Sequence, residues 1–273
     1  MKRYPTVLTI AGSDSSGGAG IQADLKTIAA LGAYGASAIT ALTAQNTQGV
    51  KAIHPVPADF LKEQLDAIFE DLIVDAVKIG MINTVEAAVA IAEILDRYKP
   101  EFVVFDPVMV STSGSKLIEN ETIAVLWKEL FPRVDLITPN LDEGQILISG
   151  KIDSVELLKE AAEEMVRKGC KAVLLKGGHL VAPTLSDVFA RQNEETLILE
   201  SGYIASSNLH GTGCTLSSAI ATYMALGNSL PEAIIFAKKY ISEAIEAGKD
   251  VKTGHGPGPL NHSFSPINMQ FVL

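Results

Sequence analysis

Short apolar runs alternate with amphipathic segments along most of the chain, and this alternation constrains its fold more than any other feature. The runs predict strands at Thr6–Ile10, Ala36–Thr43, Ala76–Ile79, Phe102–Phe105, Leu136–Thr138 and Ala172–Leu175. The segments between them predict helices at Ile21–Leu31, Phe60–Leu72, Thr84–Tyr98, Thr122–Leu130 and Val155–Lys168. Such alternation is typical of an α/β protein with a mainly parallel sheet and helices on both faces.

The pattern changes in the last third of the chain. Asp187–Arg191 and Thr196–Leu199 are predicted to be antiparallel strands at an edge of the sheet. Two helices, Cys214–Leu226 and Pro231–Ala247, are expected to close the fold. The sequence contains no internal repeat and no shift in composition that would mark a linker, so we expect a single domain over residues 1–273.

Two helix starts carry a capping signature. Asn83 with Glu86 and Ser229 with Glu232 each place a short polar residue ahead of a glutamate three positions later. This spacing lets the two residues satisfy the free N–H groups of a first turn. We therefore expect capping pairs at both positions.

Composition excludes several classes of partner. The chain has 273 residues, a formal net charge of -10 and two cysteines. The acidic balance disfavours nucleic acid and anionic membrane as partners, and two cysteines are too few for a disulfide framework. Because the sequence shows neither a signal peptide nor an apolar run of about 18 residues, we expect a soluble cytoplasmic protein without a membrane partner.

Ligands of such sheets bind beyond the carboxyl ends of the strands, where three glycine-rich segments of this chain fall. They are Ala11–Gly20 (AGSDSSGGAG), Lys176–His179 (KGGH) and His210–Thr215 (HGTGCT). The first lacks both the Walker A ending and a GxGxxG pattern, so the common nucleotide fingerprints are missing. The first two segments also have an alternative interpretation as a simple turn after a strand.

The segment HGTGCT predicts the most specific chemistry. Gly211, Thr212, Gly213 and Cys214 open a helix, where consecutive backbone N–H groups can bind a phosphoryl group in transfer. The same positive field is expected to lower the pKa of Cys214 below about 8.5, so that the thiolate could accept a proton from an alcohol. The alternative is that Cys214 packs as a small apolar residue.

Two acidic segments suggest a metal site. Asp106 follows a buried strand, and Asn140 and Glu143 lie in TPNLDE at the start of a helix. Carboxylate oxygens suit Mg²⁺, which keeps several waters and bridges to phosphates, and we take Asp106 and Glu143 as its candidate ligands. Helix capping by Asn140 and Glu143 is the alternative interpretation. Zinc spacing and a Gly-x-Ser-x-Gly motif are both absent from the sequence.

Taken together, these segments resemble the hydroxymethylpyrimidine and phosphomethylpyrimidine kinases of thiamine biosynthesis, within the ribokinase-like superfamily. The matching segments, in family order, are TIAGSDSSGGAGIQADLKT, TALTAQNTQGV, KIGM, DPVM, ITPNLDE, KGGH, HGTGCTLSSA and GHGPGPLNH. The resemblance implies a three-layer α/β/α fold, ATP as co-substrate, Mg²⁺ and a homodimer. It also implies two successive transfers, first to a hydroxymethyl oxygen and then to the resulting monophosphate.

The resemblance also assigns residues. It implies a pyrimidine pocket lined by Gln45, Asp24, Met81, Gly12, Ala19 and Val108. Asp106, Asn140, Glu143 and Lys176 would serve ATP and magnesium, and Cys214 would be the base, with Gly211, Thr212 and Gly213 as the anion hole. A glutamine amide offers a donor beside an acceptor, so Gln45 suits an aminopyrimidine.

Three other functions compete with this hypothesis. A pyridoxal kinase is the nearest, but the AQNT segment with Gln45 favours the pyrimidine type. The sequence lacks the GxGxxG fingerprint of a dinucleotide-dependent oxidoreductase, and a non-catalytic vitamer-binding protein would release no ADP.

Loop composition further predicts flaps over the site at Val110–Lys116 and His179–Ser186.

Overall fold

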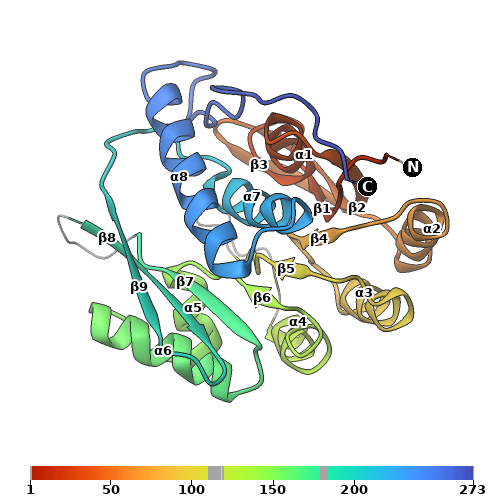
Figure 1. The fold of residues 1–273 in the computed structure, drawn as a ribbon. Coiled ribbons are helices and arrows are strands. Elements are labelled where there is room, and N and C mark those ends of the chain that lie inside the picture. The colour runs from red at the N-terminus through yellow and green to blue at the C-terminus, as the bar shows by residue number, and fades with distance from the viewer. Residues whose placement is uncertain (1, 110–117, 119, 179–183, 273) are drawn as a thin grey trace.

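The structure, a computed structural model, describes residues 2–109, 118, 120–178 and 184–272. Within them nine strands form one sheet in the order β3-β2-β1-β4-β5-β6-β7-β8-β9 (Figure 1). The strands are β1 (Thr6–Ser13), β2 (Tyr34–Asn46), β3 (Gly49–Pro55), β4 (Ala76–Ile79), β5 (Val103–Phe105), β6 (Leu136–Ile137), β7 (Ala172–Lys176), β8 (Thr184–Arg191) and β9 (Leu197–Gly202).

The centre of the sheet is parallel and its edges are antiparallel. Strands β2, β1, β4, β5, β6 and β7 pair in parallel, whereas β3 pairs antiparallel with β2, and β8 pairs antiparallel with β7 and β9. The carboxyl ends of the six central strands therefore meet at one edge of the sheet. Loops that are far apart in the sequence come together there.

Helices cover both faces of the sheet. They are α1 (Gly20–Ala30), α2 (Ala58–Phe69), α3 (Val85–Tyr98), α4 (Asn120–Val125), α5 (Leu141–Ile148), α6 (Val155–Arg167), α7 (Thr212–Ala225) and α8 (Leu230–Gly248). Side chains of α2, α3, α5 and α6 share one apolar core with Leu8 and Ile10 of β1. Those of α1, α7 and α8 share the other core with Val7. The alternation along β1 thus divides its side chains between two helical layers, which confirms the predicted three-layer α/β/α architecture (Figure 1).

Most predicted elements are confirmed, with ends that shift by a few residues. The exception is β3, which was not predicted, because most of its side chains are exposed and it carries little apolar alternation. The predicted helix at Thr122–Leu130 is confirmed, but its last turn, Leu126–Leu130, is π-helical. Both predicted edge strands near the end of the sheet are present as β8 and β9.

One predicted cap is confirmed and one is wrong. Ser229 and Glu232 form a capping box at the start of α8. At the start of α3, however, the cap is Thr84, whose hydroxyl accepts the N–H of Ala87 at 3.1 Å. Asn83 lies one residue too early to reach the first turn.

Two further predictions concern membranes and flaps. Over the described ranges, the structure contains no helix that combines the length and the hydropathy needed to cross a membrane. The predicted flap at Val110–Lys116 lies outside the described residues, as does the 179–183 part of the second flap. Thr184 to Ser186, the rest of that second flap, belong to β8, so the flap prediction is wrong for these residues.

Candidate active site

Polar side chains that follow the central strands meet at the carboxyl edge of the sheet. Asp106 follows β5, and its Oδ1 lies 2.9 Å from Nζ of Lys176 at the end of β7. Thr138, directly after β6, donates its hydroxyl to the same oxygen at 3.0 Å. The parallel topology thus joins the aspartate and the lysine, 70 residues apart, in a largely buried ion pair.

The charged groups around this pair change each other's pKa values. Burial opposes the charge of Lys176, but the carboxylates of Asp106 and Glu143 outweigh it and hold the pKa of Lys176 above its ordinary value. Burial raises the pKa of Glu143 to about 7. The negative charge of Asp106 also raises this pKa, whereas the positive charge of Lys176 lowers it. Such a cluster of perturbed groups at the end of a sheet is a typical mark of a functional site.

Asn140 and Glu143 form a capping box at the start of α5. Asn140 accepts the N–H of Glu143 at 2.9 Å, and one oxygen of Glu143 accepts the N–H of Asn140 at 2.8 Å. The other oxygen accepts the N–H of Met109 at 3.3 Å. The capping interpretation is therefore present in the structure, and a magnesium-binding role for Glu143 stays a prediction.

The side chains at this site do not provide a complete coordination shell for a metal ion. In the part of the chain that the structure describes, no group of three or more His, Cys, Asp or Glu side chains could hold a metal ion. Asp106 uses Oδ1 for Thr138 and Lys176, while its Oδ2 faces Gly213. This donor set fits a hydrated Mg²⁺ that is held largely by phosphate oxygens.

The loop before α7 lies directly against this ion pair. A Cβ atom placed on Gly213 would lie 2.9 Å from Oδ2 of Asp106 and 3.4 Å from Nζ of Lys176. Gly211 has a φ of 90°, and a Cβ there would lie 1.9 Å from the carbonyl oxygen of Gly18. Only glycine allows the backbone to approach so closely at both positions.

The predicted anion hole needs one correction. The N–H of Thr212 donates to the carbonyl of Leu209 at 3.3 Å, so it is already used in a turn. Gly213 and Cys214 lie in the first turn of α7, where backbone N–H groups have no acceptor within the helix. These two N–H groups, in the positive field of the helix, can bind an anion beside Lys176.

The predicted pKa of Cys214 is wrong. Burial raises the pKa of its thiol to about 11. The charge of Lys78 and the N–H of Gly20 lower it, but Asp24 and Asp106 oppose them. The field at the helix start is therefore weaker than the cost of placing a thiolate in a buried site near two carboxylates, and the thiol is neutral at pH 7.

Asp24 lies in a closed polar cluster beneath the loops. Its carboxylate and the ammonium of Lys78 are both fully buried and lie 2.8 Å apart. Thr9 and Ser218 donate to the same carboxylate at 2.6 Å and 2.7 Å. This arrangement favours a structural role for Asp24, which joins α1 to β1, β4 and α7. Its predicted contact with a substrate ring remains untested.

The other residues predicted to line the pyrimidine pocket lie at the same edge of the sheet, Gly12 near the end of β1 and the rest in loops. Gly12 lies beside Met81, because a Cβ on Gly12 would lie 2.6 Å from the terminal methyl of Met81. Ala19 precedes α1 and donates its N–H to Asp14 at 2.9 Å. Val108, two residues beyond Asp106, is half-buried. Their contact with a ring remains a prediction.

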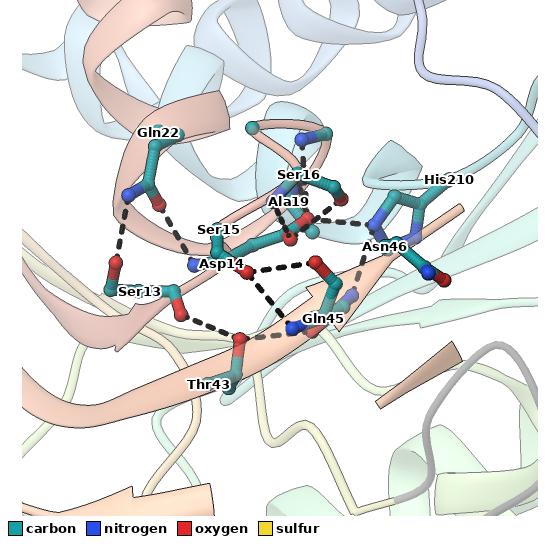
Figure 2. A network of polar contacts seen from close by, with 12 residues as sticks. Ser13, Asp14, Ser15, Ser16, Ala19, Gln22, Thr43, Gln45, Asn46 and His210 are labelled. Carbon is teal, nitrogen blue, oxygen red and sulfur yellow. Dashed lines mark hydrogen bonds and ion pairs between the residues drawn. The ribbon is translucent and has the colours of Figure 1, made fainter. Parts of the chain in front are cut away.

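Gln45, near the end of β2, belongs to a polar network that joins this strand to the loop after β1 and to the loop before α7 (Figure 2). Its amide nitrogen lies 3.3 Å from Nε2 of His210, and the same Nε2 lies 2.8 Å from Oδ2 of Asp14. Asp14 is buried, which opposes its charge, but hydrogen bonds from His210, Ser16 and Ala19 hold its pKa well below the ordinary value. These hydrogen bonds tie the loop after β1 to the loop before α7.

No role was assigned from the sequence to three of these residues. Asp14 lies inside AGSD, His210 begins HGTGCT, and Lys78 lies inside KIGM. All three motifs were identified in the sequence. The position of Asp14 directly after a strand is the kind of signal that could have marked it as a site residue. The partners of His210 and Lys78 are 196 and 54 residues away, and no local pattern indicates such pairings.

Comparison with known proteins identifies the family. A family model described as phosphomethylpyrimidine kinase matches residues 14–261. The chain belongs to the phosphomethylpyrimidine kinase family. A hydroxymethylpyrimidine/phosphomethylpyrimidine kinase of Rhizobium meliloti (strain 1021) is 50% identical over 258 residues, which cover 93% of this chain and 96% of that relative. The chain is therefore a phosphotransferase.

Some relatives are longer proteins. The thiamine biosynthesis bifunctional protein ThiED of Geobacter sulfurreducens is 51% identical over 257 residues, or 94% of this chain and 52% of that protein. A probable thiamine biosynthetic bifunctional enzyme of Oryza sativa is matched over 48% of its length. The kinase chain thus spans about half the length of these two relatives.

Solved structures agree on the fold and differ in their named activities. A phosphomethylpyrimidine kinase of Clostridium difficile 630 has a TM-score of 0.78 at 46% identity, covering 88% of this chain and 99% of that one. A pyridoxal kinase of Staphylococcus aureus, solved with AMP-PCP and pyridoxal, has a TM-score of 0.87 at 34% identity, covering 96% and 94%. The kinase therefore has the ribokinase-like fold. Sequence identity places it nearer to the pyrimidine kinases.

Proposed function

We propose that this kinase transfers the γ-phosphoryl group of ATP to 4-amino-5-hydroxymethyl-2-methylpyrimidine and then to the resulting monophosphate, within thiamine biosynthesis. The observation that carries the proposal is the contact of Gly213 with the Asp106–Lys176 pair. It places the backbone N–H groups at the start of α7 beside a buried cation, as phosphoryl transfer requires. The names of the relatives at 50% identity support the substrate.

ATP is the phosphoryl donor expected of a kinase. We propose that Lys176 and the N–H groups of Gly213 and Cys214 hold the transferred group. Asp106 and Glu143 would hold a hydrated Mg²⁺, whose chemistry is to neutralise charge on the phosphate oxygens. Asn140 fixes Glu143 through the capping box, and this bond supports a positioning role for it near the nucleotide.

In the first transfer the hydroxymethyl oxygen bonds to the γ-phosphorus, the bond from that phosphorus to the bridging oxygen breaks so that ADP leaves, and the hydroxyl proton passes to solvent water. The transition state is loose, so positioning and charge stabilisation supply most of the acceleration. The second acceptor is an ionised phosphate and has little need of a base. Since the thiol of Cys214 has a pKa of about 11, we propose that it acts as a neutral group beneath the anion hole.

At the ring end we propose that Gln45 recognises the 4-amino group and the adjacent ring nitrogen. The amide can supply one acceptor and one donor to this pair. Gly12, Met81, Ala19 and Val108 would provide apolar and backbone contacts to the ring. Two of the four border the network of Figure 2: Gly12 lies near the end of β1, two residues before Asp14, and Ala19 donates its N–H to Asp14.

The test is ADP release from ATP and Mg²⁺ with hydroxymethylpyrimidine, its monophosphate and pyridoxal in parallel. We expect turnover of both pyrimidines and loss of turnover when EDTA removes the metal. Turnover of pyridoxal alone would replace the proposal with pyridoxal kinase, which the structural likeness to the Staphylococcus aureus enzyme makes the second candidate. ATP binding without turnover of any of the three would contradict both.

Two coarser features are proposed with it. We expect a homodimer, because paired subunits are the commonest assembly, and sedimentation velocity should give twice the mass of the chain. We also expect the protein in the cytoplasmic fraction of its cell. A monomer, or recovery with membranes, would contradict these expectations without touching the catalytic proposal.

A further inference from the structure

The side chain of Gln45 lies between two groups whose hydrogen-bonding roles are fixed by other partners. Its Nε2 lies 3.3 Å from Nε2 of His210, and its Oε1 lies 3.3 Å from Oγ1 of Thr43. The oxygen and nitrogen of an amide exchange places by a half-turn with almost no change of shape. The neighbours therefore decide which orientation is stable.

His210 can act only as a donor through Nε2. That atom lies 2.8 Å from Oδ2 of Asp14, which also accepts the N–H groups of Gly18 and Ala19 (Figure 2). An ionised carboxylate has no proton to donate. Nε2 of His210 must therefore carry the proton, and it has no lone pair left for the amide N–H of Gln45.

Thr43 can act only as an acceptor toward Gln45. Its hydroxyl lies 2.9 Å from the carbonyl oxygen of Ser13, which has no proton of its own (Figure 2). A hydroxyl has one hydrogen, and this carbonyl takes it. The oxygen of Gln45 would then face lone pairs of Thr43, while its nitrogen would face a donor.

A half-turn of the amide removes both conflicts. Its oxygen then becomes a second, more distant acceptor for the single Nε2–H of His210, at 3.3 Å beside Asp14 at 2.8 Å, in a three-centre hydrogen bond. Its nitrogen then faces the hydroxyl oxygen of Thr43. We infer that Oε1 of Gln45 accepts from Nε2–H of His210, that Nε2 donates to Oγ1 of Thr43, and that His210, oriented by Asp14, is a positioning residue for ring specificity. In this orientation the other lone pair of Oε1 and the other hydrogen of Nε2 are left for a ligand.

The consequence for specificity rests on the proposed function. A 4-aminopyrimidine presents a donor beside an acceptor, which matches the remaining acceptor and donor of Gln45. The corresponding 4-oxo ring, with a carbonyl beside a ring N–H, presents the reverse pattern. An amide held by His210 and Thr43 cannot turn to suit that ring without leaving two polar groups mismatched. The network therefore fixes the preference for the amino ring.

The orientation can be measured without any substrate. In full-length protein with ¹⁵N-labelled glutamine, the Gln45 side-chain amide is assigned by its absence from the Gln45→Glu variant. We expect nuclear Overhauser contacts from its NH₂ protons to the methyl group of Thr43. Contacts to the ring protons of His210 instead would overturn the inference, whatever the substrate proves to be.

The role in specificity has a separate test with the amino and 4-oxo rings. His210→Phe keeps a planar ring beside Gly18 but removes the donor, so KM for the amino ring should rise about tenfold with kcat little changed. Its preference over the oxo ring should fall by a similar factor. His210→Gln, whose two amide hydrogens can serve Asp14 and Gln45, should restore the preference.

His54→Gln, at an exposed position on β3, is the control and should behave as wild type. An unchanged preference in His210→Phe would overturn the positioning role. If the wild-type kinase uses neither ring, the proposed function fails, while the amide orientation is still decided by the nuclear Overhauser contacts.

Discussion

The proposed phosphate end of the site comprises Asp106, Lys176, Gly213 and Cys214, and the proposed ring end comprises Asp14, Thr43, Gln45 and His210. The phosphate end is built from the ends of parallel strands and a helix start, and it works through charge and backbone N–H groups. The ring end is built from a β-hairpin strand and two loops, and hydrogen-bond direction governs it. Charge stabilises a transition state, whereas hydrogen-bond direction selects a substrate, so damage to the two ends should appear in different kinetic constants.

The largest effect is expected at Lys176. Replacing it with Met removes the cation beside Gly213 and leaves Asp106 buried without its ion partner, so kcat should fall about a thousandfold. Lys171→Met is a matched control, because Lys171 also lies 2.9 Å from an aspartate oxygen but is 52% exposed, against 15% for Lys176. Steady-state ADP release measures both, and equal losses in the two variants would contradict the assignment.

Gly213→Ala should separate stability from activity. Alanine favours a helix over glycine by about 1 kcal/mol, but its Cβ would press on Asp106 Oδ2 at 2.9 Å. The displacement of the Asp106 carboxylate offsets this gain, so we expect a melting temperature close to that of the wild type with kcat about a hundredfold lower. Gly202→Ala, where a Cβ meets nothing within 4 Å, should leave kcat unchanged. Full activity in Gly213→Ala would show that this contact is not needed.

At the ring end, Gln45→Met should raise KM for the aminopyrimidine about tenfold or more with little change in kcat or in KM for ATP. The loss follows from two ring polar groups without partners. Gln48→Met, in the turn between β2 and β3, is the control. A fall in kcat with an unchanged KM would remove the distinction between the two ends of the site.

The smallest effect concerns the pH dependence that Cys214 contributes. With a pKa of about 11, the thiolate fraction rises about tenfold per pH unit below that value. If the thiolate were the base, the kcat ratio of wild type to Cys214→Ala would rise about a hundredfold from pH 7 to 9. We expect the ratio to stay within about threefold for the first transfer, and a steep rise would restore the base.

The sequence predicted the phosphate end better than the ring end, for a physical reason. Asp106, Asn140 and Lys176 each follow or end a strand, and parallel strands place such residues at one edge whatever the details of packing. Gln45 was found through its motif, but no local pattern indicates its partners. His210 lies 165 residues further along the chain, and the hydroxyl of Thr43 is oriented by the carbonyl of Ser13, 30 residues away in the neighbouring strand.

Electrostatics explain the other errors. The helix start at Cys214 predicted a lowered pKa, but its value depends on burial and on Asp24 and Asp106, which are distant in sequence. The pairing of Asp24 with Lys78, 54 residues away and fully buried, is likewise invisible in the local sequence. The electrostatic potential at a titrating atom is a sum over all the charges that the fold brings near it. A local sequence pattern predicts only the contribution of the helix to which the atom belongs.

The two ends of the described chain meet beside the amino ends of the strands. Arg3 pairs with Val272 across an isolated bridge, and it also binds Asp75 just before β4 (Figure 1). The catalytic edge is the opposite one, at the carboxyl ends of the same strands. A short linker from Val272 to Arg3 would therefore allow a circular permutant with an intact site. A protein fused at either terminus would be attached near the amino ends of the strands, away from the edge where the nucleotide is proposed to bind.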